Sequence, residues 1–164
     1  MPIDLYRIDD RLIHGQVVVG WGQPLDLGFI VLVDDEVASS EWEQELYRMG
    51  VPPEMDVHFE SVASATTRYA TYARDPRPGL LLTGDIDTMA QLVAATDGAI
   101  RTVNLGGIHY RANRVQRLRY VFLSDDEQRA LRALASRGVE VSAQDVPSAR
   151  PVPLEDVLGA RGDA

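Results

Sequence analysis

The sequence predicts an α/β fold, a single domain with an open, mainly parallel twisted sheet and helices on both faces. Short apolar and β-branched segments alternate with longer segments of helical period, which is the pattern of parallel strands joined by helices. The chain has 164 residues, 45% of them hydrophobic, which suits one domain with a large core. We therefore expect one domain over residues 1–164, with ligands bound beyond the carboxyl ends of the strands.

The first third of the chain predicts two strands and two helices. Residues 3–8 form the first strand, and a helix follows over residues 14–21, where three valines make its surface apolar all round. Residues 29–33 are a continuous apolar run, typical of a strand buried on both faces. Three carboxylates at 34–36 suit the N-terminus of the next helix, which we expect over residues 37–49.

The middle of the chain repeats this alternation. After a Pro-Pro turn, residues 56–60 predict a short strand, and residues 61–73 predict a helix with a serine cap. Prolines and a glycine then break the chain before a buried strand at 80–83. A helix over 88–95 and a strand over 102–105 follow.

The last third contains the best-defined helix. Residues 120–123 are expected to continue the sheet, and the Ser-Asp-Asp-Glu capping box that follows starts a helix ending at Gly138. Residues 139–141 are expected to close the sheet. An extended linker over 147–153 and one terminal helical turn over 154–158 complete the prediction.

Composition excludes several kinds of chemistry. Sixteen basic and 25 acidic residues give a net charge of -9, which disfavours a nucleic-acid binder with a broad cationic face. The chain has no Cys and no Lys, which excludes thiol nucleophiles, a Walker A lysine and lysine Schiff bases. No signal segment or run of 18 apolar residues occurs, so we expect a soluble cytoplasmic protein.

The densest cluster of reactive side chains lies where the first predicted strand ends. His14 stands at the start of the next helix, where a neutral imidazole keeps one ring nitrogen free as a nucleophile. The N–H groups of Gly15 and Gln16 at that helix start favour a bound phosphoryl group. These residue types together predict phosphoryl transfer.

Charged neighbours complete this predicted site. Arg7 and Arg11 are expected to neutralise the equatorial oxygens of a transferring phosphoryl group, and Asp10 is expected to accept a hydrogen bond from the second ring nitrogen of His14. A structural interpretation also fits the same residues: a satisfied histidine, a helix-capping Asp9-Asp10 pair and arginines in surface ion pairs.

The string Arg-Ile-Asp-Asp-Arg-Leu-Ile-His-Gly-Gln-Val at residues 7–17 closely resembles the phosphohistidine loop of the mannose/fructose/sorbose-family enzyme IIB of the bacterial phosphotransferase system. Residues 33–38, 51–53, 103–108 and 137–141 also resemble segments of this family, in order along the chain. The resemblance therefore covers nearly the whole chain and implies the same open parallel sheet.

The resemblance also implies a reaction and its partners. His14 would accept a phosphoryl group on Nδ1 from a phosphohistidine IIA protein and pass it to a sugar held by a IIC/IID membrane permease, the reaction of a protein-phosphohistidine–sugar phosphotransferase. Arg11 would stabilise the phosphoryl group and Asp10 would support the loop, with no metal or organic cofactor. The alternative is a regulatory phosphohistidine module of an incomplete system, without sugar transport.

Other candidates follow from position. His109 follows a Gly-Gly turn and could approach the site or lie exposed, and Asp85 at another strand end could tune docking. Leu12 and Ile13 are expected to form an exposed apolar rim that a IIA protein covers. The three histidines have no metal-ligand spacing, so no metal site is predicted.

Overall fold

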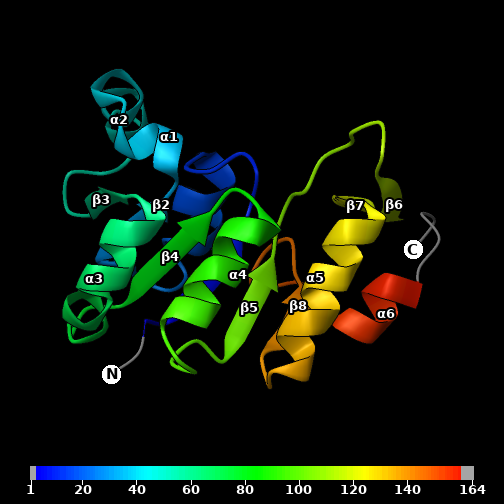
Figure 1. Cartoon of the computed structure of the whole chain (residues 1–164). Helices are drawn as coiled ribbons and strands as arrows, with labels where there is room; N and C mark the ends of the chain where they lie inside the picture. The colour runs from blue at the N-terminus through cyan, green and yellow to red at the C-terminus, as the bar shows by residue number, and fades with distance from the viewer. Residues whose placement is uncertain (1–2, 160–164) are drawn as a thin grey trace.

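The computed structural model describes residues 3–159, and it confirms the predicted fold class (Figure 1). The predicted domain over 1–164 also includes residues 1–2 and 160–164, which lie outside the described residues. The elements follow in the order β1 (Leu5–Ile8), π-helix η1 (Gln16–Trp21), β2 (Phe29–Val33), α1 (Asp35–Ala38), α2 (Glu41–Arg48), β3 (Asp56–Glu60), α3 (Val62–Ala73), β4 (Gly79–Thr83), α4 (Ile86–Ala95), β5 (Thr102–Leu105), β6 (Val115–Leu118), β7 (Val121–Leu123), α5 (Asp125–Ser136), β8 (Glu140–Ala143), β9 (Val152–Pro153) and α6 (Leu154–Gly159).

Seven of these strands form one sheet in the order β3-β2-β4-β1-β5-β8-β9. The first six are parallel, and only β9 runs antiparallel, at the edge beside β8. Strands β2, β3 and β4 all lie on one side of β1. The connection after β4 then crosses to the other side of β1, where β5 and β8 follow. The strand order therefore reverses at β1, and ligands of open α/β sheets bind at such a point.

Two hydrophobic clusters cover the two faces of the sheet. Strand β2 contributes alternate residues to them: Phe29 packs on the face covered by α3, α4 and α5, and Ile30 packs on the face covered by η1. All five β2 residues are buried, as the continuous apolar run predicts. Figure 1 shows α3, α4 and α5 side by side along the front of the sheet.

Two predicted helices differ from the structure. The helix expected over 37–49 is two helices, because the Ser40 hydroxyl accepts a hydrogen bond from the Glu43 N–H and starts α2 anew. The first helix is a π-helix, with Gly22 N–H donating to the Val17 carbonyl at 2.9 Å. Val19 of this helix is 55% exposed, so the helix is not buried on all sides.

The prediction that residues 120–123 continue the sheet is wrong. Residues 121–123 do form a strand, β7, but it pairs antiparallel with β6 in a separate two-stranded sheet, because β8 already occupies the position beside β5. Residues 152–153 of the expected linker form β9, so the sheet ends there and not at β8. The serine caps of α3 and α5 are confirmed as full capping boxes. Within residues 3–159 no helix is long and apolar enough to cross a membrane.

Candidate functional site

The loop after β1 lies at the carboxyl ends of three neighbouring strands. Asp9 N–H donates to the Thr83 carbonyl at the end of β4, at 2.9 Å, and Asp10 N–H donates to the Gly107 carbonyl beyond β5, also at 2.9 Å. These backbone bonds extend the pairing of β1 past its last residue and fix where the loop begins. The predicted site cluster therefore sits at the point where the strand order reverses.

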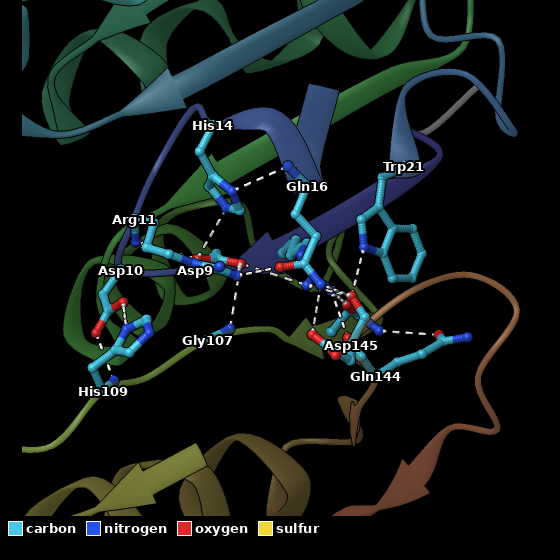
Figure 2. A network of polar contacts seen from close by, with 12 residues as sticks. Asp9, Asp10, Arg11, His14, Gln16, Trp21, Gly107, His109, Gln144 and Asp145 are labelled. Atoms are coloured by element: carbon cyan, nitrogen blue, oxygen red, sulfur yellow. Dashed lines mark hydrogen bonds and ion pairs between the residues drawn. The ribbon is translucent and has the colours of Figure 1, made fainter. Parts of the chain in front are cut away.

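Asp9 is the centre of the site (Figure 2). Its carboxylate is fully buried, and Oδ1 lies 3.3 Å from Arg11 Nε and 3.4 Å from His14 Nε2. Oδ2 accepts the Gly107 N–H at 3.3 Å and lies 3.5 Å from Arg7 Nη2. Burial acts to raise the pKa of Asp9, but the contacts with His14 and Arg11 outweigh it and hold that pKa below its ordinary value. Asp9 is therefore an anion that organises the surrounding cations.

The two ring nitrogens of His14 contact different neighbours, Nδ1 the backbone of Gln16 and Nε2 the carboxylate of Asp9. The His14 side chain is 18% exposed, and Nδ1 accepts a hydrogen bond from the Gln16 backbone N–H at 3.3 Å. A backbone N–H can only donate, so Nδ1 carries a lone pair, and the proton of a neutral ring sits on Nε2, facing Asp9. In this tautomer the lone pair of the ring is on Nδ1.

Asp10 does not orient His14. Its carboxylate accepts the His109 backbone N–H at 2.7 Å and contacts His109 Nδ1 at 2.5 Å. The prediction chose the wrong one of two adjacent aspartates, because residues two apart on an extended strand share a face. Arg7 and Asp9 therefore point together toward His14's side of the sheet, while Asp10 ties its loop to the segment after β5.

Arg7 has a different place from the predicted one. Its guanidinium is fully buried, and it donates to the Gln144 carbonyl at 2.8 Å, the Asp145 carbonyl at 3.2 Å and the Asn104 side chain. It also lies 4.6 Å from the ring centroid of Trp21. Burial lowers its pKa, and the charge of Asp9 opposes that shift. Because it is enclosed in this way, Arg7 supports Asp9 and the segment after β8 from the interior of the protein. It is not exposed to contact a phosphoryl group.

Arg11 is the cation that remains accessible beside His14. Its side chain is 38% exposed, is paired with Asp9, and donates from Nη2 to Gln16 Oε1 at 2.7 Å. Gly15 is exposed and precedes η1, as expected from the sequence. The structure thus brings Arg11, His14, Gly15 and Gln16 together.

The glycines after β5 make this close packing possible. A Cβ on Gly106 would lie 2.7 Å from Asp9 Oδ2 and would also overlap the Arg7 guanidinium. A Cβ on Gly107 would lie 3.2 Å from His109 Cε1 and 3.3 Å from Arg11 Nη2. Only glycine lets the β5 loop approach the buried carboxylate so closely.

Leu12 and Ile13 do not form an exposed rim. They are 8% and 7% exposed and belong to the apolar cluster beneath η1. Leu12 has a φ of 60°, which turns its side chain inward against Gly84.

Asp85 caps α4 by accepting the Thr88 N–H at 2.7 Å. His109 is 55% exposed at the edge of the site.

The residues of this network that the sequence did not single out include Asp9 and Asp145. Asp9 could have been chosen from the two-residue period of β1, because it shares a face with Arg7. Asp145, whose carboxylate accepts from Gln16 Nε2 at 2.8 Å, is 129 positions away and has no local signal. Among residues 3–159, no group of three or more His, Cys, Asp or Glu side chains is arranged to hold a metal ion.

Comparison with known proteins places this site in a family. The family model described as PTS system sorbose subfamily IIB component matches residues 3–163. The sorbose-specific EIIB component of Klebsiella pneumoniae is 32% identical over 96% of this chain and 96% of its own length. The mannose-specific EIIAB component of Escherichia coli K12 is also 32% identical over 96% of this chain, but the chain spans only 49% of that relative.

Solved structures agree with the sequence matches. The IIBSor domain of the Klebsiella pneumoniae sorbose permease is 31% identical and superposes with a TM-score of 0.84, covering 97% of both chains. The manxB structure from Thermoanaerobacter tengcongensis is 32% identical with a TM-score of 0.85, covering 96% of this chain and 95% of that one. The family expected from residues 7–17 is confirmed: this chain belongs to the sorbose-subfamily IIB components of the phosphotransferase system.

Proposed function

We propose that this chain is a phosphocarrier in which His14 accepts a phosphoryl group from a phosphohistidine IIA protein and passes it to a sugar at a IIC/IID permease. The observation that carries the proposal is the pair of contacts made by the His14 ring nitrogens. Nδ1 accepts the Gln16 backbone N–H at 3.3 Å and so has its lone pair, while Nε2 lies 3.4 Å from the buried carboxylate of Asp9. Membership of the IIB family supports the proposed partners.

The first transfer follows from this geometry. The Gln16 backbone N–H releases Nδ1, and the Nδ1 lone pair attacks the phosphorus while the P–N bond of the donor breaks and its electron pair returns to the donor imidazole. His14 keeps the proton on Nε2 and becomes a cation, which the carboxylate of Asp9 stabilises at 3.4 Å. Because the transition state is loose, the main task is to neutralise the phosphoryl oxygens, and Arg11 is the accessible cation for it.

The second transfer reverses the bond changes at His14. A sugar hydroxyl oxygen attacks the phosphorus, the P–Nδ1 bond breaks with its electron pair returning to the ring, and the hydroxyl proton passes to water. Asp9 faces the protonated Nε2 before and after the transfer, and the Gln16 backbone N–H donates to Nδ1 again once the phosphoryl group has left. Asp10 and His109 support this cycle by tying the loop after β1 to the loop after β5.

Intact-mass analysis tests the proposal. The protein is incubated with phosphoenolpyruvate, enzyme I, HPr and a mannose-family IIA protein, and its mass is measured at neutral pH and after acid treatment. We expect one acid-labile phosphoryl adduct on the native chain, none on His14→Ala, and a retained adduct on the control His109→Gln. An absent adduct, or one that persists in His14→Ala, would contradict the proposal.

A second step tests the acceptor. The phosphorylated protein is mixed with membrane vesicles that contain a sorbose- or mannose-type IIC/IID permease and with the corresponding sugar. We expect the adduct to disappear only when both vesicles and sugar are present, with sugar phosphate as the product. An adduct that stays on the protein under all these conditions would contradict transfer to sugar.

A further inference from the structure

One neutral side chain separates a cation from an anion at the edge of the site. Gln16 Oε1 accepts from Arg11 Nη2 at 2.7 Å, and Gln16 Nε2 donates to Asp145 Oδ1 at 2.8 Å (Figure 2). A side-chain amide has an acceptor at one end and donors at the other, so it satisfies both charged groups in a fixed order. The sequence prediction gave Gln16 only a backbone role.

We infer that the Gln16 side chain is a positioning residue that keeps Arg11 from pairing with Asp145, so that Arg11 stays available to the phosphoryl group on His14. This inference rests on the proposed function. It gives a role to two groups that take no direct part in the transfer steps, the amide of Gln16 and the carboxylate of Asp145.

The backbone of Asp145 is fixed by hydrogen bonds from two buried side chains. Its carbonyl accepts hydrogen bonds from Arg7 Nη2 at 3.2 Å and from Trp21 Nε1 at 3.1 Å, which fix the backbone of the segment after β8. Gln144 is fixed in the same way, since its own carbonyl accepts from Arg7 at 2.8 Å. The backbone of Asp145 is therefore held in place, and its carboxylate lies on the far side of the Gln16 amide from Arg11.

The Arg11 guanidinium, in contrast, contacts the Asp9 carboxylate at 3.3 and 3.4 Å, longer than its 2.7 Å hydrogen bond to Gln16. The Arg11 side chain is 38% exposed, and the planar guanidinium pairs strongly with carboxylates through two parallel N–H bonds. If the amide were removed, Arg11 and Asp145 would face each other across the space it had filled. A phosphoryl group arriving at His14 would then have to displace Asp145 before Arg11 could stabilise its oxygens.

The residue type at position 16 fits this task. Alanine would remove the bridge, and glutamate would place a further negative charge beside both Asp145 and the phosphoryl group. Glutamine is neutral and long enough to reach Arg11 and Asp145 at once. Substitution of the side chain leaves the backbone N–H that donates to His14 Nδ1 in place.

Rapid-quench measurement of phosphoryl uptake from a mannose-family IIA protein tests the inference. Two variants lack the amide, Gln16→Ala and the larger Gln16→Met. We expect each to slow uptake about tenfold, because one charge-assisted contact between Arg11 and the phosphoryl group is lost. Asp145→Asn keeps an acceptor for Gln16 and should react at the native rate. The double variant Gln16→Ala/Asp145→Asn should recover to within about twofold of that rate.

Two outcomes would overturn the inference: native-rate uptake by both Gln16 variants, or a double variant as slow as Gln16→Ala. A crystal structure of Gln16→Ala provides a readout that does not depend on transfer. We expect the Arg11 guanidinium within hydrogen-bond distance of the Asp145 carboxylate, and an Arg11 that stays on Asp9 alone would overturn the inference. Native protein that takes up no phosphoryl group would instead contradict the proposed function, and the crystal structure would still decide the role of Gln16.

Discussion

Replacing Arg7 tests the conclusion that this arginine supports the site from within. Arg7→Met removes a fully buried guanidinium and leaves the buried carboxylate of Asp9 without one of its cations. The carbonyls of Gln144 and Asp145 also lose their donors, at 2.8 and 3.2 Å. Breaking a buried ion pair costs about 3–5 kcal/mol. Because Arg11 and His14 stay beside Asp9, we expect a loss of about 3 kcal/mol, at the lower end.

Urea unfolding followed by circular dichroism measures this loss. With a slope near 2 kcal/mol/M, the midpoint should fall by about 1.5 M while the slope stays constant. Arg129→Met is the matched control, because Arg129 is 70% exposed and pairs with Asp126 one helical turn away. Its removal should cost less than about 0.5 kcal/mol. A loss below about 1 kcal/mol for Arg7→Met would refute the conclusion that Arg7 holds Asp9 and the segment after β8.

Three further changes test other parts of the structure. Gly106→Ala would place a Cβ 2.7 Å from Asp9 Oδ2, so we expect about 1–3 kcal/mol of destabilisation in thermal melting, and an unchanged melting temperature would contradict the close approach. Leu12→Asp puts a carboxylate at a position 8% exposed and should lower the urea midpoint strongly, whereas an exposed rim would tolerate it. Burial and the contact with Glu60 raise the pKa of Tyr72 to about 12. An unfolded tyrosine ionises near pH 10, so the unfolded state loses its proton first and stability should fall as the pH rises from about 10 to 12. Tyr72→Phe should lack this part of the alkaline loss, and equal losses measured by urea unfolding at pH 9 and 11 would contradict it.

The strands and capped helices could be predicted because their signals are local. The apolar run at 29–33 can be buried only between two helical layers, and the serine caps of α3 and α5 lie within three residues of the groups they bind. His14 could be singled out for the same reason, since a reactive residue after the first strand lies at the ligand-binding edge of such a sheet.

Other features depend on contacts between distant segments. Strand β6 has the sequence Val-Gln-Arg-Leu, and only its pairing with β7 makes it a strand. The burial of Leu12 depends on its positive φ and on the space above Gly84. Arg7 is buried because the segment after β8 supplies its acceptors, more than 130 positions along the chain. None of these partners can be identified from the residues themselves.

The central claim is that Nδ1 of His14 is the nucleophile. Nuclear magnetic resonance of protein labelled with ¹⁵N in its three histidines, recorded before and after enzymatic phosphorylation, tests this claim most directly. We expect phosphorus coupling to Nδ1 of His14 alone, with Nε2 still protonated and facing Asp9. Coupling to Nε2 of His14, or to a nitrogen of His58 or His109, would contradict it.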